Sequence, residues 1–252
     1  MKLQYRAFDI DQQEGNSSPR MAKSAFSDKT LKSAKPVKRV APQRKVGVRE
    51  LSAQATRENI LKAATKVFAK HGFNGGSVEK ISKAAKSVDR MLYYYFGNKE
   101  GLFIEVIEDI YRRMNEAESK LDLNTEEPVQ ALKDVIAFVL NYYRRNPEFV
   151  TLLNTENLHM GRHIVKSDRA AQYSSPAIDV IRRILETGVR KKLFRKDLAA
   201  RDVYLLIVST GYFFMSNRYT LSAFMGEDLQ LPEAVQQWQD FVTDTVLRTV
   251  KR

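Results

Sequence analysis

The sequence of 252 residues contains no cysteine and few residues that interrupt helices, with 11 glycines and 7 prolines. Without cysteine, disulfide bonds and thiolate chemistry are excluded, and a reducing compartment is compatible. No apolar run approaches the roughly 18 residues that span a bilayer, and residues 1–15 lack the apolar core of a signal peptide. We therefore expect a helix-rich cytoplasmic protein with no membrane partner.

Motifs for catalysis and cofactors are also missing. The sequence contains no Ser/His/Asp set, no phosphate-binding glycine loop and no deaminase motif, so we predict no enzyme, no catalytic residues and no cofactor. His159 and His163 have the spacing of helical metal ligands, with Glu156 three residues before the first. Because Gly161 interrupts the helix between them, we predict no metal site and place both histidines at a helix end or on the surface.

The net charge of +12 is distributed unevenly along the chain. Residues 1–56 carry 12 basic against 5 acidic side chains, residues 57–100 carry 9 against 4, and residues 101–252 carry 21 against 21. All of the excess positive charge thus lies in the first hundred residues, which favours a polyanionic partner, either nucleic acid or an acidic membrane surface. Lysines kept for solubility are the simpler alternative.

Residues 1–50 show no sustained periodicity, and the basic run from Lys35 to Lys45 is interrupted by proline. Such a segment cannot hold a helix or bury a face. We predict a flexible basic arm that either adds phosphate contacts or is simply a loose terminus.

Three short helical patterns follow, and the first runs from about Ser52 to His71. Gly72 ends this helix, and Phe73 is expected to fold back and seal the turn. Four basic residues, Arg57, Lys62, Lys66 and Lys70, stay outside its apolar stripe. The residues predicted to form the buried stripe are Ile60, Ala64, Val67, Phe68 and His71.

The second pattern begins after Gly75-Gly76, with Ser77 in an N-cap position, and buries Val78, Ile81 and Ala85. The third spans about 88–96. It offers Met91, Leu92, Tyr95 and Phe96 for packing and leaves Asp89, Arg90, Tyr93 and Tyr94 projecting. Asn98 is a candidate cap for a longer helix that starts at Lys99.

Two short helices joined by about three residues and braced by a third have the arrangement of a helix-turn-helix, whose second helix enters the major groove. Ser77 and its neighbouring backbone N–H groups are suited to one phosphate, and Tyr93, Tyr94 and Lys99 to others. The alternative from spacing alone is an ordinary three-helix pack with half-buried tyrosines.

This stretch resembles the N-terminal domain of TetR-type transcriptional repressors over nearly fifty residues. Their pattern is F…GF, then T/S-V-x-x-I-A, a turn, and L-Y-x-Y-F-x-x-K-E-x-L. The matching residues are Phe68, Gly72, Phe73, Ser77, Val78, Ile81, Leu92, Tyr93, Tyr95, Phe96, Lys99, Glu100 and Leu102. The resemblance implies that Ser77, Tyr93 and Lys99 contact DNA phosphates and that residues 89–91 and Tyr94 face the bases.

The turn departs from the family pattern. Family members usually read A-G-V-S there, whereas this chain reads Ala85-Lys86-Ser87-Val88. A lysine at positive φ costs on the order of 1 kcal/mol relative to glycine. We expect Ser87 to cap the third helix one position early and count it among the DNA-facing residues. The predicted DNA-binding set is Ser77, Ser87, Asp89, Arg90, Met91, Tyr93, Tyr94 and Lys99.

The remainder of the chain predicts further helices and no strand, so the fold class is all-α. Expected helices span about 99–121, 127–145, 147–160, 175–192, 199–224 and 231–250. In the family the first of these is the lever between the DNA heads and the C-terminal body. We predict an arm over 1–50, a three-helix DNA-binding domain over 51–98 and a larger effector-binding and dimerisation domain over 99–252.

The last two helices are apolar or aromatic on several faces, and such helices must be covered on more than one side. The resemblance implies a homodimer whose last two helices form a four-helix interface. Burial within a single chain is the alternative. The residues assigned to dimerisation are Tyr204, Val208, Tyr212, Trp238, Phe241 and Thr245.

The helix around 147–160 places Glu156 and Asn157 in the same sector as its apolar residues. Polar groups on an apolar face need partners, which are a small-molecule effector or an internal hydrogen-bond network. The residues assigned to an effector pocket are Tyr111, Met114, Tyr143, Glu156, Asn157, Phe213 and Asn217.

The leading prediction is a homodimeric, sequence-specific DNA-binding regulator of TetR type, a repressor that leaves a pseudo-palindromic operator when a small effector binds. The resemblance implies this mechanism. One alternative is a regulator that needs no effector. Another is a helical protein–protein adaptor whose basic arm binds an acidic partner or a membrane.

Overall fold

The computed structural model describes residues 47–172 and 175–252, and the predicted arm lies almost wholly outside them. In the described residues the chain forms helices and no strand ladder, with a single bridge between Phe194 and Lys251. The all-α fold class is thereby confirmed. Residues Val46–Arg252 belong to one compact unit.

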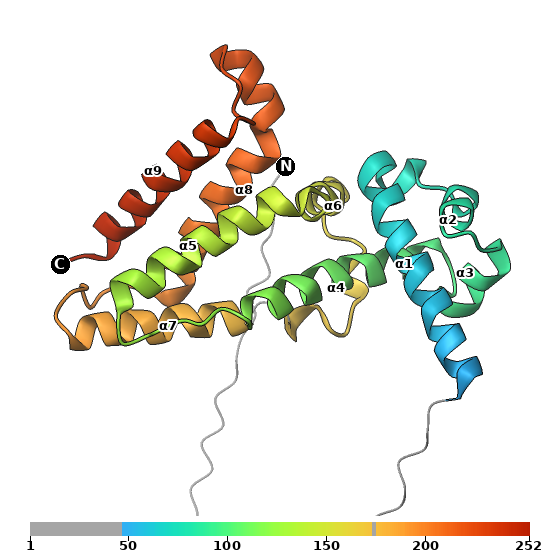
Figure 1. Ribbon diagram of the computed structural model, residues 1–252, viewed down its shortest axis with the longest axis horizontal. Coiled ribbons are helices and arrows are strands. Elements are labelled where there is room, and N and C mark those ends of the chain that lie inside the picture. The colour runs from blue at the N-terminus through green and yellow to red at the C-terminus, as the bar shows by residue number, and fades with distance from the viewer. Residues whose placement is uncertain (1–46, 173–174) are drawn as a thin grey trace, which may run out of the picture. The chain divides into compact units, whose positions relative to one another are not determined.

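The first three helices form a small bundle, here called the head: α1 (Val48–Gly75), α2 (Val78–Ala84) and α3 (Asp89–Phe96) (Figure 1). Helix α1 is interrupted at Gly72, whose φ of 67° and ψ of 179° are not helical. A positive φ is readily adopted by glycine, so the predicted end of the helical run at this residue is confirmed. The helix begins four residues earlier than expected.

The predicted apolar stripe of α1 is confirmed at four of its positions: Ile60, Ala64, Val67 and Phe68 are buried. His71 is exposed, so its inclusion was wrong. Phe73 takes the place at the end of the stripe, because the turn at Gly72 returns its ring to within 6.1 Å of Phe68 and 5.1 Å of Phe103.

Helix α4 (Lys99–Glu118) connects the head to the body, which comprises α5 (Pro128–Arg145), α6 (Pro147–Leu158), α7 (Ser175–Arg190), α8 (Ala200–Met225) and α9 (Pro232–Val250). Two short 3₁₀ turns, Ile164–Lys166 and Ala170–Gln172, lie between α6 and α7. The five body helices and α4 match the predicted ranges within three residues at each end.

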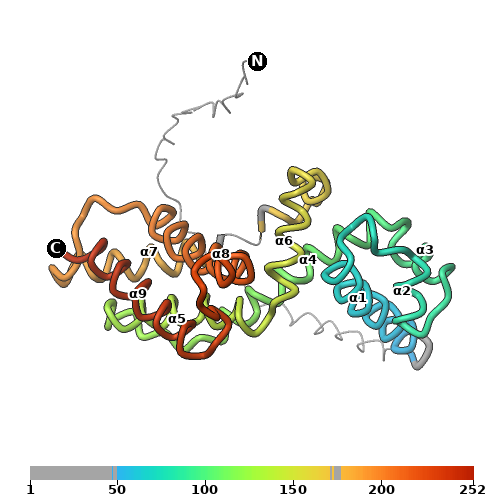
Figure 2. The backbone as a smooth tube through the Cα atoms, turned by 90° about the horizontal axis from the view of Figure 1, so that it is seen from above, coloured from blue at the N-terminus to red at the C-terminus, as the bar shows by residue number. Residues whose placement is uncertain are grey.

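Helix α5 is the centre of the body, since it packs against α6, α7, α8 and α9. The tube view shows α5, α7, α8 and α9 grouped together, with α4 running from them to the head (Figure 2). Helix α6 packs on α1 and α8, so it touches both head and body. Because α4 and α6 both pack on α1, a movement of either helix would shift α1 of the head directly.

Candidate nucleic-acid interface

The turn between α2 and α3 holds the geometry of a helix-turn-helix. The Ser77 hydroxyl caps α2 by accepting the Lys80 backbone N–H at 3.2 Å. Lys86 has a φ of 51°, and the next N–H, of Ser87, donates to the Ser82 carbonyl at 2.9 Å. The predicted lysine at positive φ is confirmed.

The expected cap of α3 by Ser87 was wrong. The N-cap position of α3 is occupied by Val88, and no side chain caps the helix. The backbone N–H of Ser87 donates to the Ser82 carbonyl, which holds Ser87 in the turn. Ser87 is therefore one residue before the N-cap position of α3. In the first turn of α3 the Met91 N–H donates to the Val88 carbonyl at 2.9 Å, and no side chain caps the N–H groups before it.

The outer face of α3 is polar and aromatic. Tyr93 is 51% exposed and Tyr94 76%, and Asp89 and Arg90 are also exposed. Leu92 and Phe96 are buried on the opposite side, while Met91 and Tyr95 are half-buried against the core. Two adjacent exposed tyrosines argue against the half-buried pack that spacing alone allowed.

Lys99 joins the start of α4 to the end of α1. Its Nζ atom donates to the Asn74 carbonyl oxygen at 3.3 Å and lies 4.7 Å from the centre of the Phe73 ring. Burial lowers the pKa of the Lys99 ammonium. Beside it, Asn98 caps α4 as predicted, accepting the Gly101 N–H at 2.7 Å.

A buried pair from the body supports this corner of the head. The side chain of His163 is fully buried, and its Nδ1 atom lies 2.6 Å from Glu156 Oε2. The backbone N–H groups of His163 and Ile164 both donate to Glu156 Oε1, at 2.8 and 2.9 Å. The His163 ring also packs 4.4 Å from Phe73, measured between ring centres. The predicted surface position of His163 was therefore wrong.

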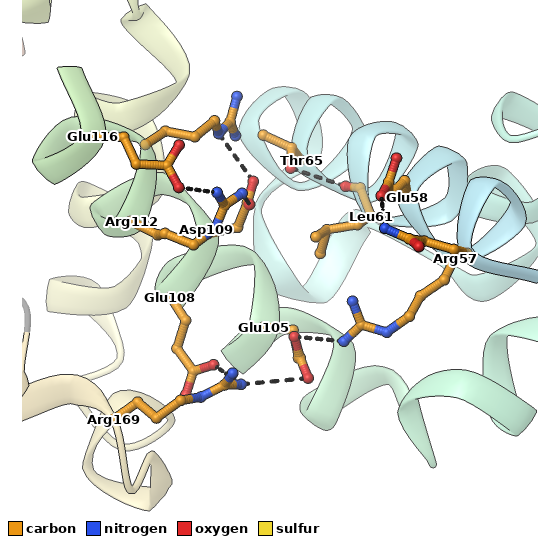
Figure 3. Close-up of polar contacts among 12 residues, drawn as sticks. Arg57, Glu58, Leu61, Thr65, Glu105, Glu108, Asp109, Arg112, Glu116 and Arg169 are labelled. Carbon is orange, nitrogen blue, oxygen red and sulfur yellow. Dashed lines mark hydrogen bonds and ion pairs between the residues drawn. The ribbon is translucent and has the colours of Figure 1, made fainter. Parts of the chain in front are cut away.

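A row of acidic side chains on α4 provides a second connection (Figure 3). Glu105 pairs with Arg57 of α1 at 2.8 Å and with Arg169 of the α6–α7 segment at 3.5 Å. Arg169 also pairs with Glu108, which accepts a hydrogen bond from Ser167. The same helix thus holds an arginine from the head on one side and an arginine from the body on the other.

These ion pairs line a cleft of about 700 Å³ between α1 and α4. Asp109 pairs there with both Arg112 and Arg113. The lining mixes acidic and basic side chains, and the ion pairs of Arg57, Asp109 and Arg169 connect its walls, so the cleft does not present a single sign of charge to a ligand.

The body contains a cluster of four tyrosines: Tyr111, Tyr143, Tyr204 and Tyr212. The rings of Tyr143 and Tyr212 lie edge to face, 6.4 Å apart between centres. Burial raises the pKa of Tyr111 to about 12, and it raises the pKa values of the other three phenols as well. The Tyr212 hydroxyl donates to Asn154 of α6.

This cluster changes two assignments. Tyr204 and Tyr212, assigned from the sequence to a dimer interface, face the tyrosines of α4 and α5 instead, with Val208 half-buried between them on α8. Phe213, assigned to an effector pocket, is 57% exposed on another side of α8. The physical reason is that α8 is apolar all round, so periodicity alone cannot tell its inner face from its outer one.

The remaining effector candidates are distributed differently from the predicted pocket. Met114 is buried, Asn157 is exposed, and Asn217 donates back to the Phe213 carbonyl within α8. In the described residues Glu156 contacts the backbone N–H groups of His163 and Ile164 and the His163 ring, which is the arrangement of an internal hydrogen-bond network. Of the original set, Tyr111 and Tyr143 belong to the tyrosine cluster, and Asn157 reaches it through a side-chain hydrogen bond with Tyr212.

A row of stacked aromatic residues links α8 to α9 and runs from the buried Phe214 through the half-buried Trp238 to the exposed Phe241. The Trp238 ring lies 5.1 Å from Phe214 and 5.5 Å from Phe241 between centres, and both pairs are nearly parallel. Phe241 is 60% exposed, and Thr245 is half-buried one turn further along α9.

Two family models match the chain. Residues 60–106 match the model of bacterial regulatory proteins of the tetR family, and residues 128–246 match the tetracycline repressor-like C-terminal domain. The transcriptional repressor NicS of Pseudomonas putida is 52% identical over 209 residues, which cover 83% of this chain and 99% of NicS.

The chain belongs to the TetR family. It is a helix-turn-helix DNA-binding transcriptional regulator. A second relative is the repressor SCO4008 of Streptomyces coelicolor, which is 32% identical over 160 residues. These residues cover 62% of this chain and 76% of SCO4008. Among solved structures, the putative regulator SCO4942 of the same species has a TM-score of 0.57 at 20% identity and covers 77% of this chain and 98% of its own. That likeness supports the fold.

The sequence patterns did not reveal the contacts that join the head to the body in this TetR-family chain. Glu156 and His163 are seven residues apart and meet only because the chain turns at Gly161, which has a φ of 71°. Arg57, Glu105 and Arg169 come from three separate elements. In the described part of the chain, no helix is long and apolar enough to cross a membrane.

Proposed function

We propose that this TetR-family protein is a cytoplasmic repressor that binds a pseudo-palindromic operator as a homodimer and leaves it when a small effector binds the body. The observation that carries the proposal is the exposed face of α3, where Asp89, Arg90, Tyr93 and Tyr94 project from a folded helix-turn-helix. The repressive sign follows NicS, with which the chain shares half of its residues over nearly all of NicS.

In the proposed complex, α3 lies in the major groove. Arg90 and Tyr94 face base edges, whereas Ser77 and Tyr93 hold phosphates on the two sides of the groove. Lys99 has a second role, because its ammonium already binds the Asn74 carbonyl and the Phe73 ring. A phosphate bound by Lys99 would therefore be held by an ammonium group that already contacts the Asn74 carbonyl and the Phe73 ring.

The proposed dimer uses the outer face of α8 and α9. Phe213 and Phe241 are more than half exposed on these helices, and Trp238 stacks beside Phe241. Large aromatic side chains in that position favour burial against another apolar surface. A two-fold pairing of this face would present two heads to two half-sites, which a palindromic operator requires.

The proposed release mechanism is a population shift. An effector in the body would favour an arrangement of α4 in which the heads do not fit the operator spacing, and it must bind that arrangement more tightly than the DNA-competent one. The contacts of Arg57 with Glu105 and of His163 with Phe73 are the means by which α4 and α6 would transmit the change.

Selection of genomic DNA fragments by the purified protein at a stated salt concentration tests this function. We expect one pseudo-palindromic sequence, with binding weakened about ten-fold or more by Arg90→Ala. Fragments with no common sequence, bound weakly and equally by the variant, would instead support the adaptor alternative.

The regulator without an effector is tested separately. Metabolites would be screened by thermal shift and then added to the complex with the selected operator. A compound that both stabilises the protein and releases the DNA supports the proposal, whereas a full screen with no stabilising compound favours the constitutive regulator.

A further inference from the structure

A cavity of about 800 Å³ lies between the C-terminal end of α4 and the helix α7. It is separate from the mixed-charge cleft between α1 and α4, with which it shares no lining residue. Its volume is in the range of small-molecule sites. The lining residues are Asn115, Glu118, Ser119, Asp179, Val180, Arg182, Arg183 and Glu186.

Glu118 is the distinctive residue of this cavity. Its side chain is half-buried, and burial raises the pKa of its carboxyl group. Among residues 47–172 and 175–252, no basic side chain forms an ion pair with it. The other charges of the lining are more exposed: Asp179 pairs with Arg182, and Arg183 and Glu186 stand on the exposed side of α7.

The tyrosine cluster lies within electrostatic reach of the same carboxylate. The negative charge of Glu118 adds to the effect of burial in raising the pKa values of Tyr143 and Tyr204. These phenols are neutral at physiological pH, so they supply no positive charge to balance the Glu118 carboxylate. The tyrosines lie outside the lining of the cavity, and the unpaired carboxylate of Glu118 is the feature that the cavity itself presents.

We propose that this cavity binds a small organic cation that carries a protonated amine, with Glu118 as its counter-ion. Partial burial disfavours the charged form of a carboxyl group that has no counter-ion, and a bound ammonium group offsets that cost. An anionic ligand would add to the repulsion at Glu118. This inference rests on the proposed effector function and names the chemical class of the effector.

The position of the cavity also suits regulation. Glu118 is the last residue of α4, and the other end of this helix begins at the head with the Asn98 cap. A ligand held between Glu118 and α7 would fix the far end of α4 against the body. The near end carries Glu105 and Glu108, the ion-pair partners of Arg57 and Arg169.

The test compares three probes of similar size and different charge: 4-phenylbutylamine, 4-phenylbutyrate and 4-phenylbutanol. Each is titrated into the full chain by calorimetry, with thermal shift as a second measurement. We expect the amine to bind at least about ten-fold more tightly than the acid or the alcohol. Glu118→Gln should weaken amine binding by a similar factor. Glu116→Gln, on the same helix but outside the cavity, should leave it unchanged.

Three results would overturn the inference: no binding of the amine at millimolar concentration, equal binding of the acid, or amine binding that survives Glu118→Gln. Circular dichroism of the variants shows whether they remain folded. Binding of the selected operator, measured with and without the amine, distinguishes a failure of the cation inference from a failure of the proposed effector function. If the operator is recovered and the amine does not bind, the cation inference fails alone. If the amine binds without releasing DNA, the ligand class stands and the effector role fails.

Discussion

At the scale of single residues, two buried or half-buried carboxylates have opposite surroundings. Glu156 receives two backbone N–H groups and the His163 ring, so its charge is compensated within the protein. Within residues 47–172 and 175–252 Glu118 has no such donors, and burial raises the pKa of its carboxyl group. The first is a structural residue, and the second is available for a ligand.

Replacing His163 with alanine should destabilise the protein by about 2–4 kcal/mol, because it removes a fully buried ring and leaves one oxygen of Glu156 without its partner. Urea unfolding followed by circular dichroism measures the change. His159→Ala is the matched control, since His159 is partly exposed and should cost less than about 1 kcal/mol. An equal loss of unfolding free energy in the two variants would contradict the structural role assigned to the Glu156–His163 pair.

Glu118→Gln should raise the melting temperature in the absence of ligand, by about 2 °C. Burial raises the folded-state pKa of the Glu118 carboxyl group above its ordinary value of 4.5, so the unfolded chain releases its proton first as the pH increases. The wild type therefore loses relative stability above about pH 4.5, and the variant does not. Melting curves from pH 4 to pH 8 should show a difference that grows with pH and is absent at the acidic end.

At the scale of elements, the helix boundaries were predictable because local signals mark them. Asn98 caps α4, Pro147 starts α6 and Gly72 ends the regular part of α1. The faces of α8 were not predictable, because Tyr212 and Phe213 are adjacent and both aromatic, although one turns inward and the other outward. Local signals report where a helix ends, whereas orientation depends on its neighbours.

The turn between α2 and α3 gives a prediction at this scale. Lys86→Gly should stabilise the protein by about 1 kcal/mol, since glycine tolerates the positive φ that lysine adopts there. Lys83→Gly removes the same charge from the last turn of α2 and should destabilise it by about as much. Chemical denaturation of the two variants compares them, and the same sign for both would refute the conformational argument.

At the scale of the whole molecule, the proposed dimer depends on the outer face of α8 and α9. Phe241→Glu should convert a dimer to a monomer in sedimentation experiments and reduce operator affinity at least about ten-fold, because a charge is buried at the centre of the interface. Leu158→Glu alters an exposed apolar residue of α6 and should remain dimeric. A wild-type protein that sediments as a monomer at micromolar concentration would exclude this interface.

The predicted boundary at residue 98 between a DNA-binding domain and a body remains a prediction at this scale. Sequence similarity identified the family and the exposed α3 residues. Sequence similarity did not predict the contacts between head and body, because α1, α4 and the α6–α7 segment meet through residues that no local pattern connects. Long-range contacts of this kind require the packed structure.

The sharing of Glu105 between Arg57 and Arg169 has a consequence for measurements on DNA. The slope of affinity against salt is commonly converted into a number of phosphate contacts. Here salt also screens ion pairs inside the protein, because Arg57, Glu105 and Arg169 are all partly exposed. Part of the slope would then report a loosened head rather than released counterions. Counting contacts on this operator therefore requires the same titration with Arg57→Gln, so that the internal contribution is subtracted.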